Sequence, residues 1–183
     1  NVDAAAREKT VLAAGRLTEV KRFDLLIEQF AHIHEREPEW KLRILGDGED
    51  RAKLEEQIAK LGAGSYIKLT GRKNGDEVES EMLSASIFAM SSRSEGFPFV
   101  LMEAQSCGLP IIAYDVRVGP GAVVHDGEDG VLVPEGERQQ YEDKLCELMD
   151  KPELREKMSA NATAAIREFS EEKVAEKWYE VIE

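Results

Sequence analysis

Two glutamates, Glu95 and Glu103, stand eight positions apart and could accept hydrogen bonds from the hydroxyl groups of a ligand. Gly96 follows the first of them and, having no Cβ, allows the backbone to come close to a bound molecule. Pro98 suits the first turn of a helix, where its missing N–H is not needed. The segment therefore predicts a loop, a tight turn and a helix that carries Glu103 in its second turn.

The start of that predicted helix could also bind an anion. Backbone amides around Phe97 and Phe99 lack partners inside the helix, and the helix dipole adds positive charge there. Carboxylates beside an anion site suit a ligand that has both phosphates and hydroxyls, such as a nucleotide sugar. The alternative is an ordinary amphipathic helix with a solvated glutamate, which the spacing by itself favours.

Cations for such a ligand occur near the start of the chain. Residues 10–14 form a short apolar run that predicts a buried strand, and Gly15 ends it. Arg16 and Lys21 lie in the loop that follows, where a guanidinium fork and an ammonium group could neutralise a diphosphate. The alternative is a solvated loop, because most lysines and arginines are exposed.

The elements that must position these residues alternate along the chain. Apolar runs predict strands at 10–14, 40–45, 66–69, 87–90, 110–114 and 131–133. Helical patterns predict helices at about 23–36, 50–61, 76–85, 98–107 and 142–149, and one more from residue 152. This alternation is typical of an α/β protein in which helices flank a Rossmann-like parallel sheet on both faces.

That architecture would bring distant loops together, because ligands of parallel sheets bind at the carboxyl ends of the strands. The loops that follow predicted strands begin at Gly15, Gly46, Gly71, Ser91 and Asp115. We therefore expect them to meet at one edge of the sheet. This expectation favours the functional interpretation of the two-glutamate segment over the ordinary helix.

We predict a single domain over residues 1–183, with a helical tail at 152–183. Ser170 has the character of a helix N-cap. The apolar side chains that follow it at helical spacing are Val174, Trp178, Val181 and Ile182. They predict a stripe that packs on the sheet or on a neighbouring part of a longer protein, of which this chain is expected to be a fragment.

Composition narrows the class of protein. The chain is 42% hydrophobic and 33% charged, a balance typical of globular domains, and its net charge of −13 argues against nucleic acid as a partner. Cys107 and Cys146 suggest neither a zinc motif nor a disulfide framework, which indicates a reducing, cytoplasmic environment. No apolar run approaches 18 residues, so membrane contact is expected only through a domain outside this chain.

No metal or cofactor motif is recognised. Gly46-Asp47-Gly48 begins a dinucleotide-binding pattern, but Arg51 stands where its last glycine should be. There is no Walker loop and no Asp-x-Asp pair. His32 and His34 are expected at the surface, and His125 is expected to be structural.

The order of the short motifs resembles one family, the nucleotide-sugar half of retaining GT-B glycosyltransferases of family 4. The motifs are Gly15-Arg16-Leu17 with Lys21, Leu45-Gly46-Asp47-Gly48, Glu95-Gly96-Phe97-Pro98 through Glu103, and Cys107-Gly108-Leu109-Pro110. The similarity covers about residues 10–181. It implies the C-terminal, donor-binding domain of an enzyme that builds polysaccharides or glycolipids from a nucleotide sugar, with UDP-sugar expected ahead of GDP-mannose.

The resemblance also implies roles. Arg16 and Lys21 would hold the donor diphosphate and stabilise it as it leaves, so that no metal or other cofactor is required. Glu95 would contact the transferred sugar, and Glu103 would accept hydrogen bonds from the ribose.

The remaining donor contacts follow from the same resemblance. Arg72 and Lys73 would lie against the base, and Gly46 would allow close approach of the nucleotide. Backbone groups near Phe97 and Pro98 would bind sugar hydroxyls or phosphate, with Gly15 and Gly96 in the same donor-binding set.

Two features depart from the family pattern. Relatives often carry Gly-Pro-x-Glu, whereas Ala122 occupies the Glu position here. We expect the missing carboxylate to bear on sugar preference and, to a smaller extent, on activity. A GT-B enzyme also needs an N-terminal acceptor domain, so we expect this chain alone to bind donor weakly and turn over little. The alternatives are a non-catalytic nucleotide-sugar-binding or assembly subunit, and another GT-B enzyme such as a UDP-sugar epimerase.

Overall fold

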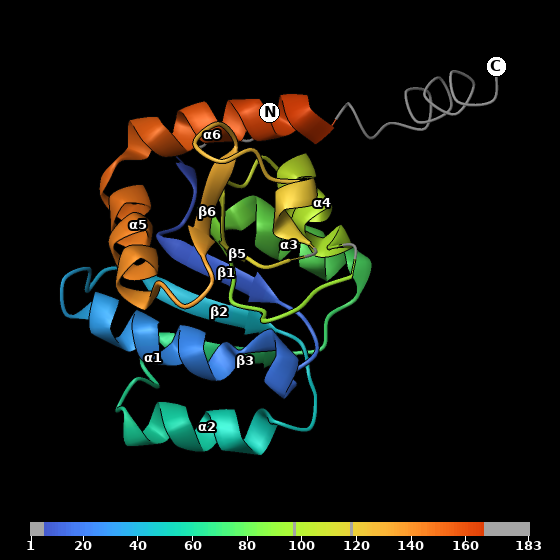
Figure 1. Ribbon diagram of the computed structural model, residues 1–183. Helices are drawn as coiled ribbons and strands as arrows, with labels where there is room; N and C mark the ends of the chain where they lie inside the picture. Colours follow the sequence, from blue (N-terminus) through green and yellow to red (C-terminus); the bar gives the residue numbers. More distant parts are fainter. Residues whose placement is uncertain (1–5, 97, 118, 167–183) are drawn as a thin grey trace, which may run out of the picture.

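The computed structural model describes residues 6–96, 98–117 and 119–166 (Figure 1). Its strands are β1 (Thr10–Ala14), β2 (Lys41–Leu45), β3 (Ile67–Gly71), β4 (Ile87–Met90), β5 (Ile111–Asp115) and β6 (Gly130–Pro134). Its α-helices are α1 (Phe23–His34), α2 (Arg51–Lys60), α3 (Gly75–Ser84), α4 (Phe99–Ser106), α5 (Arg138–Asp150) and α6 (Pro152–Ala165). Short 3-10 turns, η2 (Glu19–Lys21) and η3 (Pro120–Ala122), interrupt two loops.

The strands form one parallel sheet in the order β3-β2-β1-β4-β5-β6. The order reverses direction at β1, which lies between β2 and β4. This is the Rossmann-like arrangement, and the crevice at such a reversal is where ligands of doubly wound sheets bind. The predicted α/β fold class is confirmed.

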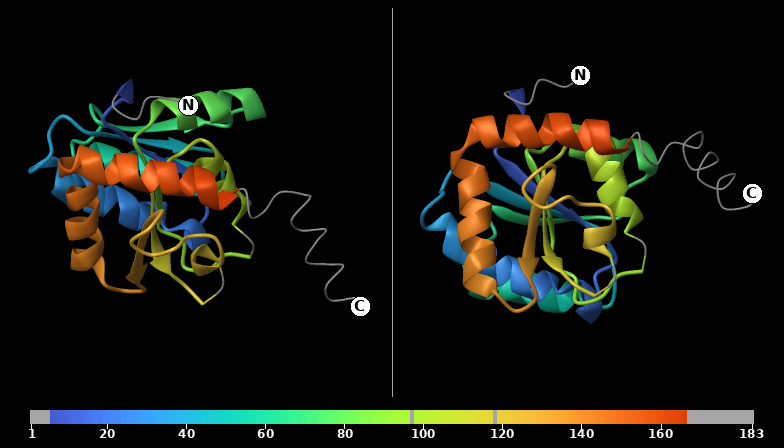
Figure 2. Two further views of the ribbon diagram at one scale, coloured as in Figure 1. Left: turned by 90° about the horizontal axis from the view of Figure 1, so that it is seen from above. Right: turned by 45° about the horizontal axis from the view of Figure 1, so that its top comes forward.

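Two separate apolar cores cover the two faces of the sheet. On one face, α1, α2 and α5 pack side chains such as Phe30, Ile58 and Tyr141 against alternate residues of the strands. On the other face, α3 and α4 do the same with Met82 and Leu101. The right-hand view of Figure 2 shows the strands between α5 and α4. Strands that are buried on both faces read as continuous apolar runs, which is why the sequence marks them clearly.

Helix α6 lies across the amino edge of the sheet, at the top of Figure 1. Its Arg155 stacks its guanidinium over the ring of Trp40, 5.2 Å from the ring centre, just before β2 begins. Asn161 donates a hydrogen bond to the Glu128 carbonyl, just before β6 begins. The carboxyl edge, where the ligand was expected, is left open.

Most predicted elements agree with the structure within two residues, and the strands at 10–14 and 87–90 agree at both ends. Helix α5 begins four residues before its predicted start. The sequence did not mark this start because residues 138–140 are exposed and have no apolar pattern. Pro98 was expected in the first turn of the helix, but it precedes α4 and occupies its N-cap position. The predicted helix and apolar stripe after residue 166 lie outside the described residues. No helix in the described ranges is both long and apolar enough to cross a membrane.

Candidate functional site

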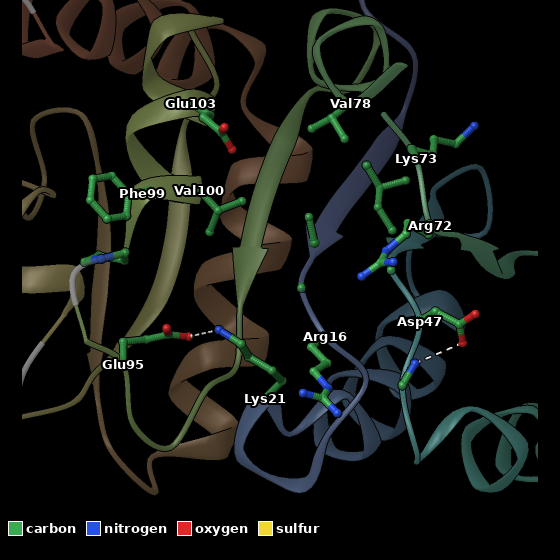
Figure 3. Close-up of a pocket in the computed structure, with 16 residues that line it drawn as sticks. Arg16, Lys21, Asp47, Arg72, Lys73, Val78, Glu95, Phe99, Val100 and Glu103 are labelled. Atoms are coloured by element: carbon green, nitrogen blue, oxygen red, sulfur yellow. Dashed lines mark hydrogen bonds and ion pairs between the residues drawn. The ribbon is translucent and has the colours of Figure 1, made fainter. Parts of the chain in front are cut away.

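A cavity of about 810 Å³ opens at the carboxyl edge, where the strand order reverses (Figure 3). The loops after β1, β2, β3 and β4 form it together with the first turns of α4. These segments are distant in sequence, and the parallel sheet brings their ends to one place. The expected gathering of loops is therefore found.

Glycines fix the backbone at the rim of the cavity. Gly46 has a φ of +135°, and a Cβ on it would lie 1.9 Å from the carbonyl oxygen of Gly15. A Cβ on Gly48 would lie 2.3 Å from the carbonyl oxygen of Leu17. Only glycine allows the loops after β1 and β2 to pack this closely. The close approach of the neighbouring loop by itself requires glycine at position 46. The approach of a nucleotide to Gly46, implied by the family resemblance, stays a prediction.

An ion pair joins the loops after β1 and β4 across the cavity. The Nζ atom of Lys21 lies 2.6 Å from Oε1 of Glu95, and both side chains are largely shielded from solvent, with 23% and 10% exposed. The stem of Lys21 passes over Gly15, where an added Cβ would lie 3.3 Å from Cε. Gly15 therefore leaves room for Lys21 to reach Glu95.

Neighbouring segments contact both Lys21 and Glu95 and fix their positions. The hydroxyl of Ser91 donates a 2.9 Å hydrogen bond to the Lys21 carbonyl, which ties η2 to the end of β4. Gly119 packs against Glu95 so closely that a Cβ on Gly119 would lie 2.8 Å from the Cβ of Glu95. The loop that carries Ala122 thus backs the glutamate, although Ala122 itself does not line the cavity.

The two basic residues after β3 differ in their surroundings. Arg72 is exposed, makes no hydrogen bond or ion pair within the described ranges, and points toward the middle of the cavity in Figure 3. Lys73 lines the wall, but its Nζ lies 3.4 Å from Oε1 of Glu81 on α3 and points away from the cavity. A capping box between Asn74 and Glu77 begins α3 directly after them and fixes this short loop. Arg72 is therefore the one of the two with its charge available to a ligand.

Arg16 is an exposed cation at the edge of the cavity. Its side chain is 75% exposed, and its nearest carboxylate is Glu49, at 3.4 Å. An exposed pair at this distance is worth little, so a ligand phosphate could replace Glu49 at small cost. Arg16 is therefore close to the cavity and not committed to a structural contact.

Glu103 lies in the second turn of α4, on the side that faces the cavity (Figure 3). Its carboxylate makes no hydrogen bond or ion pair with the described residues. Val78 of α3 and Val100 of α4 add apolar surface to the same walls. Pro98, at the N-cap position of α4, makes no side-chain capping hydrogen bond. This wall thus offers a hydroxyl acceptor, apolar contacts and the positive end of a helix dipole.

The charge of the cavity differs from that of the whole chain. Its basic residues are Arg16, Lys21, Arg72 and Lys73, and its acidic residues are Asp47, Glu95 and Glu103. The chain as a whole carries −13. The cavity thus has nearly equal numbers of basic and acidic side chains, although the protein as a whole is strongly acidic. Such a site is suited to a ligand with both anionic and hydroxyl groups.

The structure brings most of the predicted site residues to this cavity. Those that line it are Gly15, Arg16, Lys21, Gly46, Arg72, Lys73, Glu95, Pro98 and Glu103. Gly96 does not line it, and Phe97 lies outside the described residues. The sequence reasoning missed Asp47, Val78 and Val100; Asp47 belongs to the Gly46-Asp47-Gly48 turn, and the two valines carry no signal beyond helical spacing.

The histidines are not part of the cavity. His34, which was expected at the surface, is half-buried and stacks on Tyr66 with ring centres 3.4 Å apart, because its helix face meets the loop before β3. His125 pairs with the buried Asp129 through Nδ1 at 2.8 Å, in the turn before β6.

Comparison with known proteins identifies relatives of this chain. The family model for "Glycosyl transferases group 1" matches residues 2–165. The amylovoran biosynthesis glycosyltransferase AmsD of Erwinia amylovora is 32% identical over 97% of this chain and 49% of its own length. The GtfA subunit of a UDP-N-acetylglucosamine–peptide N-acetylglucosaminyltransferase from Streptococcus parasanguinis is 35% identical over 95% of this chain and 35% of its own length.

A solved structure of a GtfA protein is also similar to this chain. The pneumococcal O-GlcNAc transferase GtfA, in complex with UDP and GlcNAc, superposes with a TM-score of 0.86 at 30% identity, over 99% of this chain and 37% of that chain. The present chain therefore spans half or less of the length of each of these three relatives. With the family model matching most of its residues, the chain belongs to the group 1 glycosyltransferases and has the Rossmann-like fold of a GT-B domain.

Proposed function

We propose that this chain is the donor-binding part of a glycosyltransferase that transfers a sugar from a UDP-sugar. The observation that carries the proposal is that Arg72 and Glu103 face one cavity beside the Lys21–Glu95 pair, with no partners for their charges among the described residues. Charged groups left unpaired in a cleft are suited to a ligand that completes their contacts. The UDP and GlcNAc bound to the pneumococcal relative support the same class of ligand.

The diphosphate would lie between the loop after β1 and the amino end of α4. Arg16 and Lys21 bring positive charge from one side, and the uncapped helix end brings its dipole from the other. Both act on the negative charge that develops as the diphosphate leaves. We therefore propose a reaction that needs no metal, because fixed cations and a helix dipole already lie where that charge develops.

The nucleoside would lie along α4 and the loop after β3. Glu103 would accept hydrogen bonds from the ribose hydroxyls, and Arg72 would lie against the base. Val78 and Val100 offer apolar surface on either side of this path. UDP-sugar is the preferred donor, and GDP-mannose is the second candidate.

The transferred sugar would lie at Glu95. In the ligand-free structure this carboxylate is held by Lys21 at 2.6 Å. A diphosphate would attract Lys21 and leave an oxygen of Glu95 free to accept a sugar hydroxyl. We propose retention of the anomeric configuration and a polysaccharide or glycolipid acceptor, with the acceptor site in another part of the full-length protein.

Calorimetric titration of UDP and UDP-sugars into the purified chain tests this proposal. We expect weak binding, and we expect Arg16→Ala to weaken it about 10-fold because a charge-assisted contact to phosphate is lost. Lys53→Ala is the matched control, since Lys53 is an exposed cation on α2 outside the cavity. Equal effects of the two substitutions would refute the diphosphate contact, and no heat at millimolar UDP would refute donor binding.

A non-catalytic, donor-binding subunit is the second candidate. Ala122 supports it, because the loop behind Glu95 lacks the carboxylate that relatives often carry there. If Ala122→Glu in the full-length protein leaves donor binding unchanged but creates transfer, the non-catalytic alternative holds for the natural chain. Transfer by the unaltered full-length protein would exclude it.

A further inference from the structure

A second cavity, of about 220 Å³, lies on the carboxyl edge near the ends of β4, β5 and β6. Its lining includes three arginines, Arg22, Arg93 and Arg138, and a single acidic residue, Glu135. It shares no lining residue with the larger cavity. Three guanidinium groups around so small a space need an explanation in a chain of net charge −13.

The guanidinium groups of two of these arginines have N–H donors without hydrogen-bond partners among the described residues. Arg93 comes no closer than 3.9 Å to Glu19, and Arg138 no closer than 3.6 Å to Glu28. Neither makes a side-chain hydrogen bond within the described ranges. A guanidinium has five N–H donors, so most of the donors on both groups are available.

A serine hydroxyl in the same lining has no hydrogen-bond partner among the described residues. Ser92 is only 4% exposed, and its side chain makes no hydrogen bond to any described residue. This hydroxyl is therefore free to donate a hydrogen bond to a ligand or to solvent in the cavity. Ser91, next to it, is already bonded to the Lys21 carbonyl.

The third arginine is held in place by an unusual backbone. Arg22 has a φ of +51°, and among the described residues other than glycine it alone has a positive φ. Its side chain is fixed by Asp24 through Nε at 3.0 Å and Nη2 at 3.3 Å. Left-handed backbone in a residue other than glycine is costly and tends to persist where function requires it.

Arg22 and Arg138 act on the same side chain in the cavity wall. Burial raises the pKa of Tyr114, and the charge of Glu142 acts in the same direction. The hydrogen bond to Gln29 and the charges of Arg138 and Arg22 act in the opposite direction. Both guanidinium charges are thus felt at one phenol that lines the cavity. Helices α1 and α5 also begin here, at Phe23 and Arg138, and their dipoles add positive charge.

We infer that this second cavity is a binding site for a phosphoryl group, separate from the donor cavity. Guanidiniums from three segments and the Ser92 hydroxyl offer more donors than the two oxygens of a carboxylate can use. They suit the three terminal oxygens of a phosphate monoester or of free phosphate. Glu135 on the same wall opposes the anion and limits its affinity.

The site is directly connected to the donor cavity. Arg22 follows Lys21 in the chain, and Ser92 follows Ser91, whose hydroxyl holds the Lys21 carbonyl. An anion bound at Arg22 and Ser92 would therefore contact the two segments that carry the Lys21–Glu95 pair. A phosphate carried by an acceptor and a free phosphate share this chemistry.

Amide chemical-shift mapping of the 15N-labelled chain tests the inference. The probe is inorganic phosphate at low salt, with saturating UDP present to compete for the donor cavity. We expect saturable shifts at Ser92, Gly136 and Arg138 with a Kd of about 1–5 mM, and binding that weakens as salt screens the guanidiniums. Glucose 1-phosphate in a parallel titration shows whether an organic phosphate monoester binds better than the free ion.

Four variants sharpen the measurement. Arg93→Gln and Arg138→Gln should each weaken phosphate binding about 3- to 10-fold, because each removes charge-assisted donors. Glu135→Gln should strengthen it about 2- to 3-fold, because it removes the opposing charge. Arg36→Gln is the matched control: Arg36 is an exposed arginine near the opposite end of α1, 3.5 Å from Asp143, and should have no effect.

Several results would overturn the inference. Shifts confined to residues of the donor cavity, such as Gly46 and Glu95, would mean that phosphate binds only there. An absence of shifts, equal binding of acetate, or equal effects of Arg36→Gln and Arg138→Gln would also refute the site. Failure of UDP to bind would count against the proposed function alone, because the shifts caused by phosphate at Ser92 and Gly136 are read independently.

Discussion

The two edges of the sheet use arginine in opposite ways. At the amino edge, Arg7 donates from Nη1 to the carbonyls of Met82 and Ala85, at 3.0 and 2.8 Å, and from Nη2 to that of Cys107, at 2.5 Å. Arg155 donates from Nη1 to the carbonyls of Leu148 and Met149 in the last turn of α5. Burial lowers the pKa of both arginines, which nevertheless remain charged.

At the carboxyl edge, the two arginines that line the larger cavity are exposed and have few partners. Arg72 makes no ion pair or hydrogen bond within the described ranges, and Arg16 has only the distant Glu49.

Helix polarity explains the difference between the edges. In a parallel α/β sheet the helices end at the amino edge, where their last carbonyls need donors, and begin at the carboxyl edge, where their dipoles favour anions. The chain provides its own cations for the first edge. At the second edge Lys21 and Arg22 already have carboxylate partners. Arg16 and Arg72 are left for an anion that comes from outside. The partner of an arginine, rather than its exposure alone, distinguishes a structural arginine from one that binds a ligand.

The largest expected effect concerns the glycines of the carboxyl edge. Gly46→Ala should lower the free energy of unfolding by about 3–5 kcal/mol, because the new Cβ would meet the Gly15 carbonyl and the φ of +135° disfavours alanine. Urea denaturation measures this loss. Gly96→Ala is the control, since its Cβ would meet nothing within 4 Å. Similar stability of the two variants would show that the loops after β1 and β2 do not depend on Gly46 for their close packing.

The next largest effect distinguishes Arg7, which bonds to carbonyls at the amino edge, from Arg72, which faces the cavity at the carboxyl edge. Arg7→Leu should lower the free energy of unfolding by about 3 kcal/mol, because it leaves three carbonyls without their donor, and should not change UDP affinity. Arg72→Leu should change stability by less than about 0.5 kcal/mol and weaken UDP binding about 10-fold. Denaturation and calorimetry on both variants measure the contrast. A reversed pattern would invalidate the distinction between the edges.

The smallest expected effect on stability comes from the pair of His125 and Asp129 in the turn before β6. The hydrogen bond from His125 to Asp129 raises the pKa of His125, partly offset by desolvation. A raised folded-state pKa gives stabilisation that is complete below about pH 6.5 and is lost as the pH rises through that folded-state value. With the His125 side chain 62% exposed, the effect on stability should be at most about 0.5 kcal/mol.

An NMR titration of the His125 ring measures this directly. Asp129→Asn should lower the pKa of His125 toward its ordinary value, because the charged partner is removed. A pKa of 6.5 or below in the unaltered chain would mean that the pair at this edge contributes nothing to the charge of the histidine.

Much of the fold could be predicted from local sequence. The run at 87–90 is apolar throughout and buried on both faces, so its boundaries are sharp. The start of α5 was missed because Arg138 and its neighbours in the first turn are exposed and carry no periodic signal. Of the site residues, Glu95 and Glu103 were favoured because the predicted strands placed their segment at the ligand edge of the sheet, and Arg16 and Lys21 because they follow a strand. Val78 was missed because a valine on a helix has no feature that separates a ligand wall from a core.

The sequence by itself determined which segments alternate as strand and helix, and hence that the loops after the strands share one edge. That follows from local periodicity, which is written in consecutive residues. Only the tertiary structure decided which charges are already paired. Lys21 is held by Glu95 and Lys73 by Glu81, whereas Arg72 and Glu103 remain available. Pairing depends on side chains that come together from distant parts of the chain, and no local pattern records those distances.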